Sequence, residues 1–407
     1  MMKKITFLHT ADLHLDSPMV GLSHLPEKMY KKLLNSTFSA FRRVVDTAIE
    51  NQVDFLIIAG DIYDGEDRSI RAQVRFRSEM ERLQAANIPV YITHGNHDHL
   101  SGSWTQISLP SNVIVFGKEV EIHTFLKDNV TVHLYGFSYP TRQVLERKIE
   151  DYQKISGADF HIGILHGNDG GSSSHGNYAP FHVQDLVEKQ FDYWALGHIH
   201  KGKILSESPP IVYPGNIQGR HHKEDGPKGC YLVSLSETNY QLSWIETTDI
   251  EWNTVEIDSS LCNSFQEVYQ LCTDKLNEMR NNHAKGKLIK LVINNLKAIE
   301  GKDSLINGEL LEILQENEVE EESFIWVTAI QFKEKQNDKK ETLKSEDGFF
   351  MELYQIIDDY NQLDKAIEPL YQHYLARKYI SNLNDEEKRE MLTEAERILI
   401  DLLFEKS

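Results

Sequence analysis

Cysteine is scarce in this sequence. Only three cysteines occur among 407 residues, an odd number, and no two of them have the C-x-x-C spacing. This excludes a disulfide-stapled scaffold and a zinc site built from thiolates. Such scarcity is typical of a protein that works in a reducing compartment. The three are Cys230, Cys262 and Cys272.

Long apolar runs are also absent. No run approaches the roughly 20 residues that a membrane-spanning helix needs. The sequence starts with two lysines and a short apolar stretch, but His9, Asp12 and His14 interrupt that stretch. A signal peptide requires an unbroken apolar segment after its basic start. We therefore expect a cytoplasmic protein.

Positive charge is deficient, because 43 Lys and Arg face 63 Asp and Glu, for a net charge of −20. A protein that wraps nucleic acid with its whole surface would carry the opposite sign. The acidic excess is concentrated after residue 250, where 19 basic residues face 33 acidic ones. Histidine is distributed the other way, since 16 of the 18 lie at or before His222. The sequence therefore predicts a chemically active first half and an accessory second half.

Short apolar runs that end in polar clusters recur over the first 220 residues. Such runs include VDFLIIA, IPVYIT and FHIGIL, which are rich in Ile and Val and typical of buried strands. Apolar residues at helical spacing occupy 27–51 and 69–86. Strands alternating with helices predict an α/β layered domain, in which polar residues at the strand ends form the active site.

The chain is too long for one core, at about 150 residues per domain. We place the first domain at 1–248 and a small βαβαβ domain, without a histidine cluster, at 249–335. The polar segment 336–347 is typical of a linker, and apolar residues at three- and four-residue spacing predict a helical tail over 348–407. That tail is either an ordinary packed bundle or a docking surface for a partner's helix.

Seven residues at the ends of five apolar runs can ligate a metal through oxygen or imidazole nitrogen. In the D-x-H and H-x-H pairs, an extended chain would place both members on one side, because side chains alternate with period two. Carboxylate and imidazole ligands without thiolate favour Mn²⁺ or Fe²⁺, with zinc as an alternative for a catalytic site. Seven ligands suit two ions that share a carboxylate, an arrangement that promotes in-line phosphoryl displacement. The seven are Asp12, His14, Asp61, Asn96, His166, His198 and His200.

The motifs DLH, GD, GNHD, HG and GHIH occur in this order, within the stretches HTADLHLD, IIAGDIYD, THGNHD and WALGHIH and before YPGN. Together they resemble the calcineurin-like metallophosphoesterase superfamily, and within it the SbcD-type DNA repair exonucleases. The resemblance covers residues 1–222 strongly. It implies an α/β fold with a β-sandwich flanked by helices, followed by a small α+β capping domain and a helical C-terminal tail.

The resemblance also implies two bound divalent ions, with Mn²⁺ as the first candidate and Fe²⁺, Mg²⁺ or Zn²⁺ as alternatives. Asp61 would bridge them. His97, beside Asn96, would stabilise the transition state and protonate the leaving 3′ oxygen, which suits an imidazole that titrates near neutral pH. One ion would be held by Asp12, His14 and His200, and the other by Asn96, His166 and His198.

Asp64 departs from the family pattern, because some branches carry histidine there. Its carboxylate either hydrogen-bonds His97 and fixes the ring, as a second candidate for the catalytic machinery, or is a simple loop carboxylate. Arg220, after the YPGN turn, and His175, in the stretch GNDGGSSSHGN, are weaker candidates for binding substrate. Two histidines on the ligand-bearing strands are expected to be core or supporting residues, namely His9 and His94.

For partners, the resemblance implies DNA, a second copy of this chain, and a coiled-coil ATPase of the SbcC or YhaN type bound to the tail. These expectations describe the nuclease subunit of a DNA repair complex. The alternatives are a small-molecule phosphodiesterase, a phosphoprotein phosphatase, and a scaffold subunit with vestigial activity. The large accessory half favours DNA, because a hydrolase of small substrates does not need it. Four arginines lie close together in one helical segment. They form a solvent-exposed face, contact a second copy of the chain, or bind phosphate: Arg68, Arg71, Arg75 and Arg77.

Overall fold

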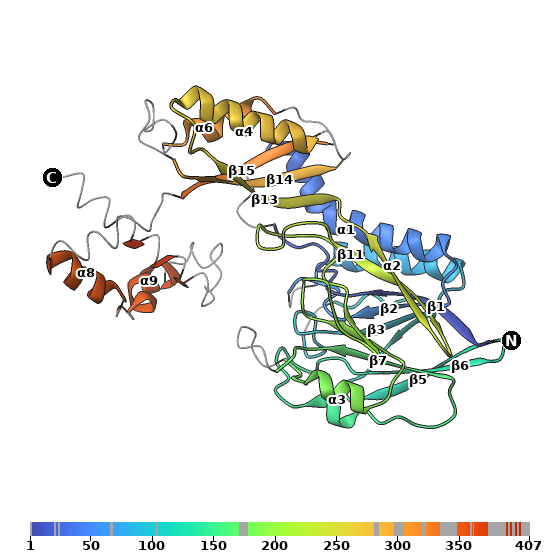
Figure 1. Cartoon of the computed structure of the whole chain (residues 1–407). Coiled ribbons are helices and arrows are strands. Elements are labelled where there is room, and N and C mark those ends of the chain that lie inside the picture. Colours follow the sequence, from blue (N-terminus) through green and yellow to red (C-terminus); the bar gives the residue numbers. More distant parts are fainter. Residues whose placement is uncertain are drawn as a thin grey trace. The chain divides into compact units, whose positions relative to one another are not determined.

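A computed structural model gives the fold of the chain (Figure 1). The residues it describes are 2–19, 22, 25–65, 68–102, 105–170, 178–280, 285–296, 305, 307–318, 323–333, 348–358, 360, 362–372, 388–389, 391–392, 395–396 and 399. The predicted linker at 336–347 and most of the predicted helical tail after residue 372 lie outside them. Among the described helices, none is long and apolar enough to cross a membrane.

The chain forms two compact units. The larger comprises Met1–Ile257, Asn263–Val292 and Ile299–Gln331, and the smaller comprises Asp258–Cys262, Ile293–Ala298 and Phe332–Ser407. The border expected at residue 248 falls within the larger unit and stays a prediction.

The first sheet of the larger unit contains the strands predicted from VDFLIIA and IPVYIT. In spatial order its strands are β12 (Tyr240–Glu246), β11 (Gly229–Ser236), β1 (Lys4–Thr10), β2 (Phe55–Ala59), β3 (Val90–Thr93) and β4 (Val113–Val115). β1 to β4 are parallel neighbours, whereas β11 and β12 form an antiparallel hairpin. All five residues of β2 are buried, which explains why FLIIA shows no polar alternation.

The second sheet is built around the strands that carry HG and GHIH at their ends. In spatial order its strands are β5 (Glu121–Lys127), β6 (Val130–Gly136), β7 (Phe160–His166), β8 (Tyr193–Gly197), β10 (Pro210–Tyr213) and β9 (Lys203–Glu207). β6, β7, β8 and β10 are parallel, and the two edge strands are antiparallel to their neighbours.

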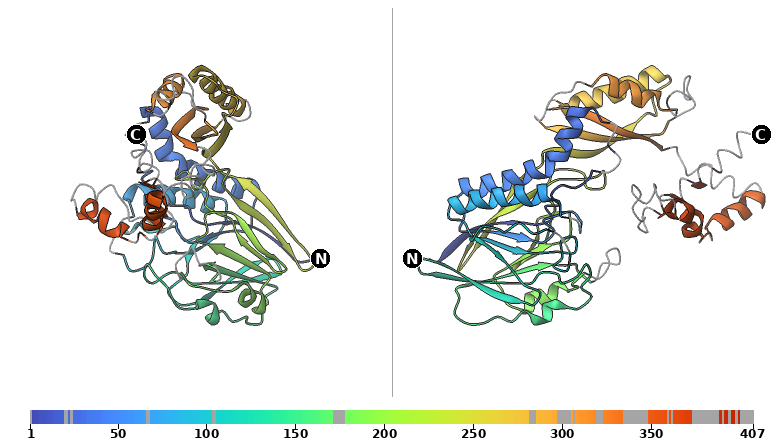
Figure 2. Two further views of the ribbon diagram at one scale, coloured as in Figure 1. Left: turned by 60° about the vertical axis from the view of Figure 1, so that its left-hand side comes forward. Right: turned by 180° about the vertical axis from the view of Figure 1, so that it is seen from behind.

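The two sheets pack face to face as a β-sandwich, seen from two further sides in Figure 2. Phe7 and Phe55 of the first sheet stack with their ring centroids 5.0 Å apart, and Tyr193 of the second sheet meets Phe7 edge-on at 5.2 Å. These rings belong to one apolar core that both sheets share. The predicted sandwich with flanking helices is therefore confirmed.

Helices cover the outer faces of the sandwich. α1 (Glu27–Glu50) and α2 (Ile70–Ala85) pack through Val44 and Phe76 onto the first sheet. α3 (Val183–Glu188) packs through Leu186 onto the second. The side chain of Ser69 caps α2 by accepting a hydrogen bond from the backbone N–H of Ala72 at 2.9 Å, which explains why that helix starts there. Both long helices were predicted from their apolar spacing.

A three-stranded sheet follows, in the spatial order β13 (Ile250–Asp258), β14 (Gly286–Asn294) and β15 (Ile325–Lys333). α4 (Phe265–Arg280) and α6 (Glu309–Glu316) connect its strands, so the predicted βαβαβ order is present. In the smaller unit the described helices are α8 (Gly348–Asp358) and α9 (Leu363–Gln372). Both lie in the segment 348–407, where a helical tail is expected.

Candidate metal centre

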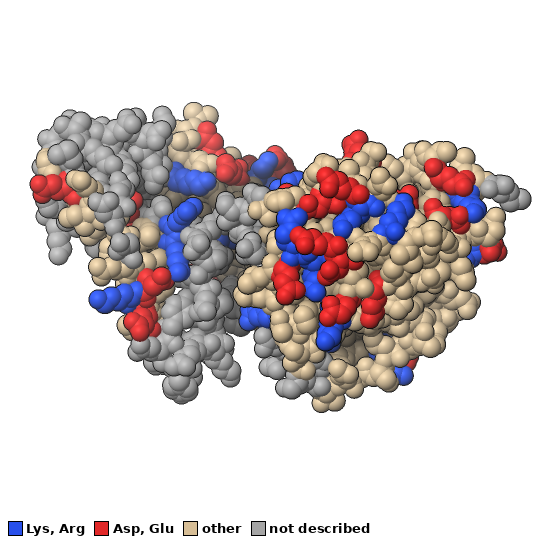
Figure 3. Space-filling model, turned by 90° about the horizontal axis from the view of Figure 1, so that it is seen from below, with Lys and Arg blue, Asp and Glu red and all other residues tan. Residues whose placement is uncertain are grey.

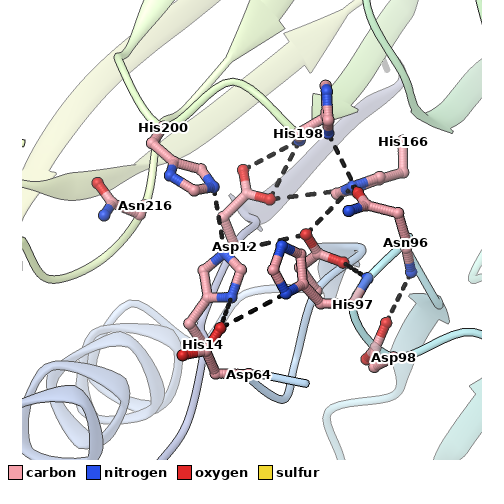
Figure 4. A network of polar contacts seen from close by, with 12 residues as sticks. Asp12, His14, Asp64, Asn96, His97, Asp98, His166, His198, His200 and Asn216 are labelled. Carbon is pink, nitrogen blue, oxygen red and sulfur yellow. Dashed lines mark hydrogen bonds and ion pairs between the residues drawn. The ribbon is translucent and has the colours of Figure 1, made fainter. Parts of the chain in front are cut away.

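The seven predicted ligands come together at one end of the sandwich. Six of them are labelled in Figure 4, and Asp61 lies among them through its contacts with His14 and His166. Asp12 and His14 follow β1, Asp61 follows β2, and Asn96 follows β3 in the first sheet. From the second sheet, His166 ends β7, and two further histidines follow β8: His198 and His200. The carboxyl ends of parallel strands from both sheets therefore meet at one place.

The backbone beneath this cluster is left-handed at several residues that are not glycine. φ is 51° at Asp12, 42° at His14, 49° at Asp61 and 100° at His198. The expectation that strand alternation places Asp12 and His14 side by side is therefore wrong. Both residues lie beyond the end of β1, where turns held by hydrogen bonds to the backbone after β2 orient them. Such sparsely populated conformations cluster at functional sites.

Two glycines allow the close approach of the ligands. A Cβ atom on Gly95 would lie 2.3 Å from Oδ1 of Asp61 and 2.6 Å from Nε2 of His166. On Gly60, where φ is +92°, it would lie 2.1 Å from Nδ1 of His166. Any larger residue at either position would displace His166.

The potential ligand atoms face one another at short distances. Oδ1 of Asn96 lies 3.0 Å from Nε2 of His166 and 3.2 Å from Nδ1 of His198. The Nε2 atoms of His14 and His200 lie 3.1 Å apart. Asp61 lies between these groups, with its Oδ2 3.4 Å from Nε2 of His166 and 3.9 Å from Nε2 of His14. Three triads have their ligand atoms all within 4.8 Å of one another: Asp12, His14 and His200; Asp12, Asp61 and His166; and His14, Asp64 and His97.

This arrangement fits divalent cations. Asp12 and Asp61 are each 1% exposed, and Oδ2 of Asp61 accepts no hydrogen bond from any residue that the structure describes. Burying two neighbouring carboxylates is costly unless a positive charge balances them. Metal ions bound by the oxygen and imidazole ligands would supply that charge.

Histidine side chains of the protein partly balance the negative charge of Asp12 and Asp61. Burial lowers the pKa of His166, but Asp61 and Asp12 more than reverse that effect and raise it to about 9. Burial raises the pKa of Asp61, and His166, His97 and His14 outweigh it and hold that pKa well below its usual range. The strong coupling of carboxylate and imidazole is the electrostatic pattern expected of a functional site.

His97 lies at the mouth of this cluster. Its backbone N–H donates to Oδ1 of Asp61 at 2.9 Å, and its ring Nδ1 lies 3.5 Å from Oδ1 of Asp64. The side chain is 35% exposed and lines a pocket of about 400 Å³ together with Asp61, His198 and His200. The His97 ring can therefore meet a molecule bound in this pocket.

Asp64 and Arg220 are parts of one ion-pair network. Oδ1 of Asp64 lies 3.3 Å from Nδ1 of His14 and accepts a hydrogen bond from Nη1 of Arg220 at 3.2 Å. Nη2 of Arg220 donates to Oε1 of Glu224 at 3.0 Å, and that oxygen lies 2.7 Å from Nδ1 of His200. One guanidinium thus joins the carboxylates behind two histidines. The expected contact of Arg220 with substrate stays a prediction.

Sequence reasoning missed Glu224 and Asp98. Glu224 is 6% exposed, and its position after two histidines and a lysine gave no signal of burial. Asp98, in the motif GNHD, accepts hydrogen bonds from the backbone N–H groups of Ile62 and Gly95 at 2.9 and 2.7 Å. Both support the turns that carry the ligands, and only the three-dimensional contacts identify them.

Two further histidines on the ligand-bearing strands contact residues that lie behind the cluster. His94 contacts Oδ2 of Asp98 through Nδ1 at 2.9 Å, and His9 lies buried between Tyr193 and the carbonyl of Leu196. Both therefore support the cluster from behind, as expected. His175 lies outside the described residues. The arginines of α2 and the turn before it hydrogen-bond within the protein: Arg68, Arg71, Arg75 and Arg77.

The loop that carries Arg220 and Glu224 is fastened to the start of β13. Oε1 of Gln218 accepts a hydrogen bond from the backbone N–H of Asp249 at 2.8 Å. Nε1 of Trp252 donates to the carbonyl of Gly219 at 3.0 Å. These bonds fix the backbone on both sides of the ion-pair network.

Comparisons with known proteins agree with this geometry. Residues 5–202 match the calcineurin-like phosphoesterase family. The chain is 38% identical over 407 residues to the uncharacterized metallophosphoesterase YhaO of Bacillus subtilis, and the alignment covers 98% of each protein. It is 26% identical over 318 residues to the DNA double-strand break repair protein Mre11 of Methanococcus maripaludis, covering 71% of this chain and 78% of that protein.

Among solved structures, a dimetal phosphatase from Danio rerio matches 60% of this chain and 96% of its own. Its TM-score of 0.37 and identity of 12% are too low to support an inference. The family resemblance drawn from the motifs is confirmed by the other comparisons. The chain belongs to the calcineurin-like phosphoesterase family and is a metal-dependent phosphoesterase, a hydrolase of ester bonds.

Proposed function

We propose that this protein is a dinuclear-metal-dependent DNA nuclease that hydrolyses phosphodiester bonds. The observation that carries the proposal is the pocket beside the histidine cluster, because it brings His97 and the candidate ligands to one surface. The likeness to proteins named for DNA double-strand break repair supports DNA as the substrate.

The ligands divide between two positions in this proposal. The opposed imidazoles of His14 and His200 support the first, and the shared contacts of Asn96 support the second. Asp61 lies within 4 Å of a histidine from each set, which supports a bridging role. Two divalent ions, Mn²⁺ first among them, would make water more acidic and neutralise charge on the phosphoryl oxygens. The first set is Asp12, His14 and His200, and the second is Asn96, His166 and His198.

His97 is the proposed general acid. Its exposed ring can approach a leaving oxygen, whereas the buried imidazoles of His14 and His166 cannot. The carboxylate of Asp64 lies on the Nδ1 side of the His97 ring, so that Nε2 is left to carry the proton. Asp64 is then a positioning residue, and the histidine found there in other branches is not needed for that task.

DNA would be held by local contacts. On the face drawn in Figure 3, Lys and Arg are interspersed with Asp and Glu, and no extended patch of one sign stands out. With a net charge of −20, long-range attraction of a polyanion is weak. We propose that 249–335 helps to present DNA, that the tail binds a coiled-coil ATPase of the SbcC type, and that the chain forms a homodimer, working in DNA repair in the cytoplasm.

A paired assay tests the proposal. Wild type, His97→Ala and Asp61→Ala are given linear DNA and bis-p-nitrophenyl phosphate with Mn²⁺, with His123→Ala on the edge strand β5 as a matched control. We expect wild type and the control to degrade both substrates and the other two variants to fail. Cleavage of the small ester alone would leave the metal site standing but contradict DNA as the substrate. Tight binding of an ATPase without any hydrolysis would favour the scaffold alternative.

A further inference from the structure

Lysines line the same pocket as the histidine cluster. Lys201, Lys223 and Lys228 contribute to its wall, beside Asp61 and His97. Its volume of about 400 Å³ lies within the range of roughly 300–1,000 Å³ typical of ligand sites. A molecule that fills the pocket would meet both the proposed metal ligands and these ammonium groups.

Lys228 differs from an ordinary surface lysine. It is 8% exposed, and its backbone is fixed at the start of β11. Its N–H donates to Oγ1 of Thr248 at 2.6 Å, and its carbonyl accepts a hydrogen bond from the N–H of Thr247 at 2.9 Å. Its Cε lies 3.7 Å from the place of a Cβ atom on Gly219, so the side chain runs beside the loop that carries Arg220.

The ammonium group of Lys228 has no hydrogen bond or ion pair with any residue that the structure describes. The stem of this side chain is buried, whereas its Nζ is not among the buried side-chain atoms without a partner, so the ammonium is the part of Lys228 that a molecule in the pocket can reach. The carboxylate of Glu224, on the same pocket wall, is already engaged by His200, Arg220 and Asn216. Burial lowers the pKa of Lys228, and the nearby charges of Glu224 and Asp225 oppose that effect. Neither carboxylate is hydrogen-bonded to the ammonium of Lys228, which is therefore available to an anion that enters the pocket.

We propose that Lys228, assisted by Lys201, binds a second phosphate group of the substrate, adjacent to the one that is hydrolysed. The inference rests on the proposed function and extends it, because it names a preference for substrates with two or more phosphates. A lysine suits this task as a compact charge that meets a phosphate oxygen without demanding one geometry. A single phosphodiester would occupy the histidine side of the pocket and leave Lys228 unpaired.

Short thymidine oligonucleotides test this preference. TpT has one phosphodiester, pTpT adds a terminal phosphate, and TpTpT adds a second phosphodiester. Wild type with Mn²⁺ should show a KM roughly tenfold lower for one or both longer substrates than for TpT, as one charge-assisted contact gives. A lower KM for pTpT alone would indicate that the site binds a terminal phosphate. A lower KM for TpTpT alone would indicate that it binds an internal one. Lys228→Met should lose the difference, Lys228→Arg should keep it, and the exposed Lys118→Met is the matched control.

A binding measurement tests the role of Lys228 without requiring catalysis. Metal-free protein is titrated into fluorescein-labelled dT10 in EDTA, and Lys228→Met should bind roughly tenfold more weakly than Lys118→Met. Equal affinities, or an unchanged KM ratio, would overturn the inference. A lower Tm of Lys228→Met with the ratio kept would also overturn it, because Lys228 would then be an internal counter-ion. If wild type degrades linear DNA but none of the three short substrates, the binding measurement decides on Lys228. If it degrades no DNA at all, the proposed function fails, and the binding measurement still decides on Lys228.

Discussion

Nη2 of Arg220 lies 3.0 Å from Oε1 of Glu224, and the guanidinium also holds Asp64 on its other side. Both residues are largely buried, with side chains 12% and 6% exposed. Solvent therefore screens the pair of Arg220 and Glu224 little. Glu224 also contacts the ring of His200, and Asp64 contacts the ring of His14. Loss of one member leaves uncompensated charge beside the candidate metal ligands.

Replacing Arg220 with Met should destabilise the protein strongly. Two buried carboxylates lose their shared cation, and breaking a buried ion pair from one side costs about 3–5 kcal/mol. Urea unfolding measures the loss. The double variant Arg220→Met with Glu224→Met should be more stable than the sum of the single variants, because the unpaired charge is removed. Simple additivity would contradict the network.

Stability should fall in mild acid through His9. Burial lowers the pKa of His9 to about 3, despite the hydrogen bond to Leu196 that opposes the shift. Because the folded-state pKa lies below the unfolded value of 6.5, protonation favours the unfolded chain. The contribution is complete above pH 6.5 and is lost as the pH falls toward 3. Between pH 7 and 5 the loss is about 2 kcal/mol.

The His9→Gln variant checks this dependence. Its free energy of unfolding in urea should change less between pH 7 and 5 than that of wild type, whatever its absolute stability. His123→Gln, on the edge strand β5, is the control and should keep the wild-type slope. Identical slopes for all three proteins would remove His9 as the cause.

Asp61 should govern metal binding. Calorimetric titration of wild type with Mn²⁺ should give two sites, and Asp61→Asn should lose at least one. Bound metal also stabilises the folded chain, by about 2.7 kcal/mol for one site at a free concentration of 100 times Kd. Mn²⁺ should therefore raise the Tm of wild type after EDTA treatment and raise that of Asp61→Asn less. An equal rise would show that Asp61 is not a ligand.

His97 and Asp64 should be separable by kinetics. His97→Ala should lower kcat by roughly 10²–10⁴ and keep the Mn²⁺ stoichiometry, because a general acid acts on the leaving group. Asp64→Asn should lower kcat less, since it changes only the orientation of the ring, and should also lower Tm through Arg220. If His97→Ala loses metal instead, His97 belongs among the ligands.

Much of the fold follows from local pattern. The uninterrupted apolar runs predicted β2, β3 and β7, because strands buried on both faces need no polar alternation. β5 was not predicted, since it is an exposed edge strand whose sequence, EIHTFLK, offers little apolar signal. The pairing of two separate sheets also lies beyond local pattern, because it depends on contacts such as that of Phe7 with Tyr193.

The candidate site was predictable where motif and chemistry coincide. Every described ligand candidate lies in the cluster, but the reason offered for Asp12 and His14 was strand alternation, and the chain is left-handed there. Glu224 and Lys228 could not be predicted, because a charged residue in a polar loop is normally exposed. Their burial results from contacts with residues 20 or more positions away, such as Thr248.

The bonds from Gln218 and Trp252 have a practical consequence for dissecting the chain. A protein cut after residue 248 would keep all seven ligand candidates yet lose Asp249 and Trp252, which hold the backbone around Arg220. In this fragment, the loop behind His200 would no longer be held by these two hydrogen bonds. A fragment that ends at that border therefore keeps the candidate ligands but lacks the hydrogen bonds that hold the loop of Arg220 and Glu224 in place.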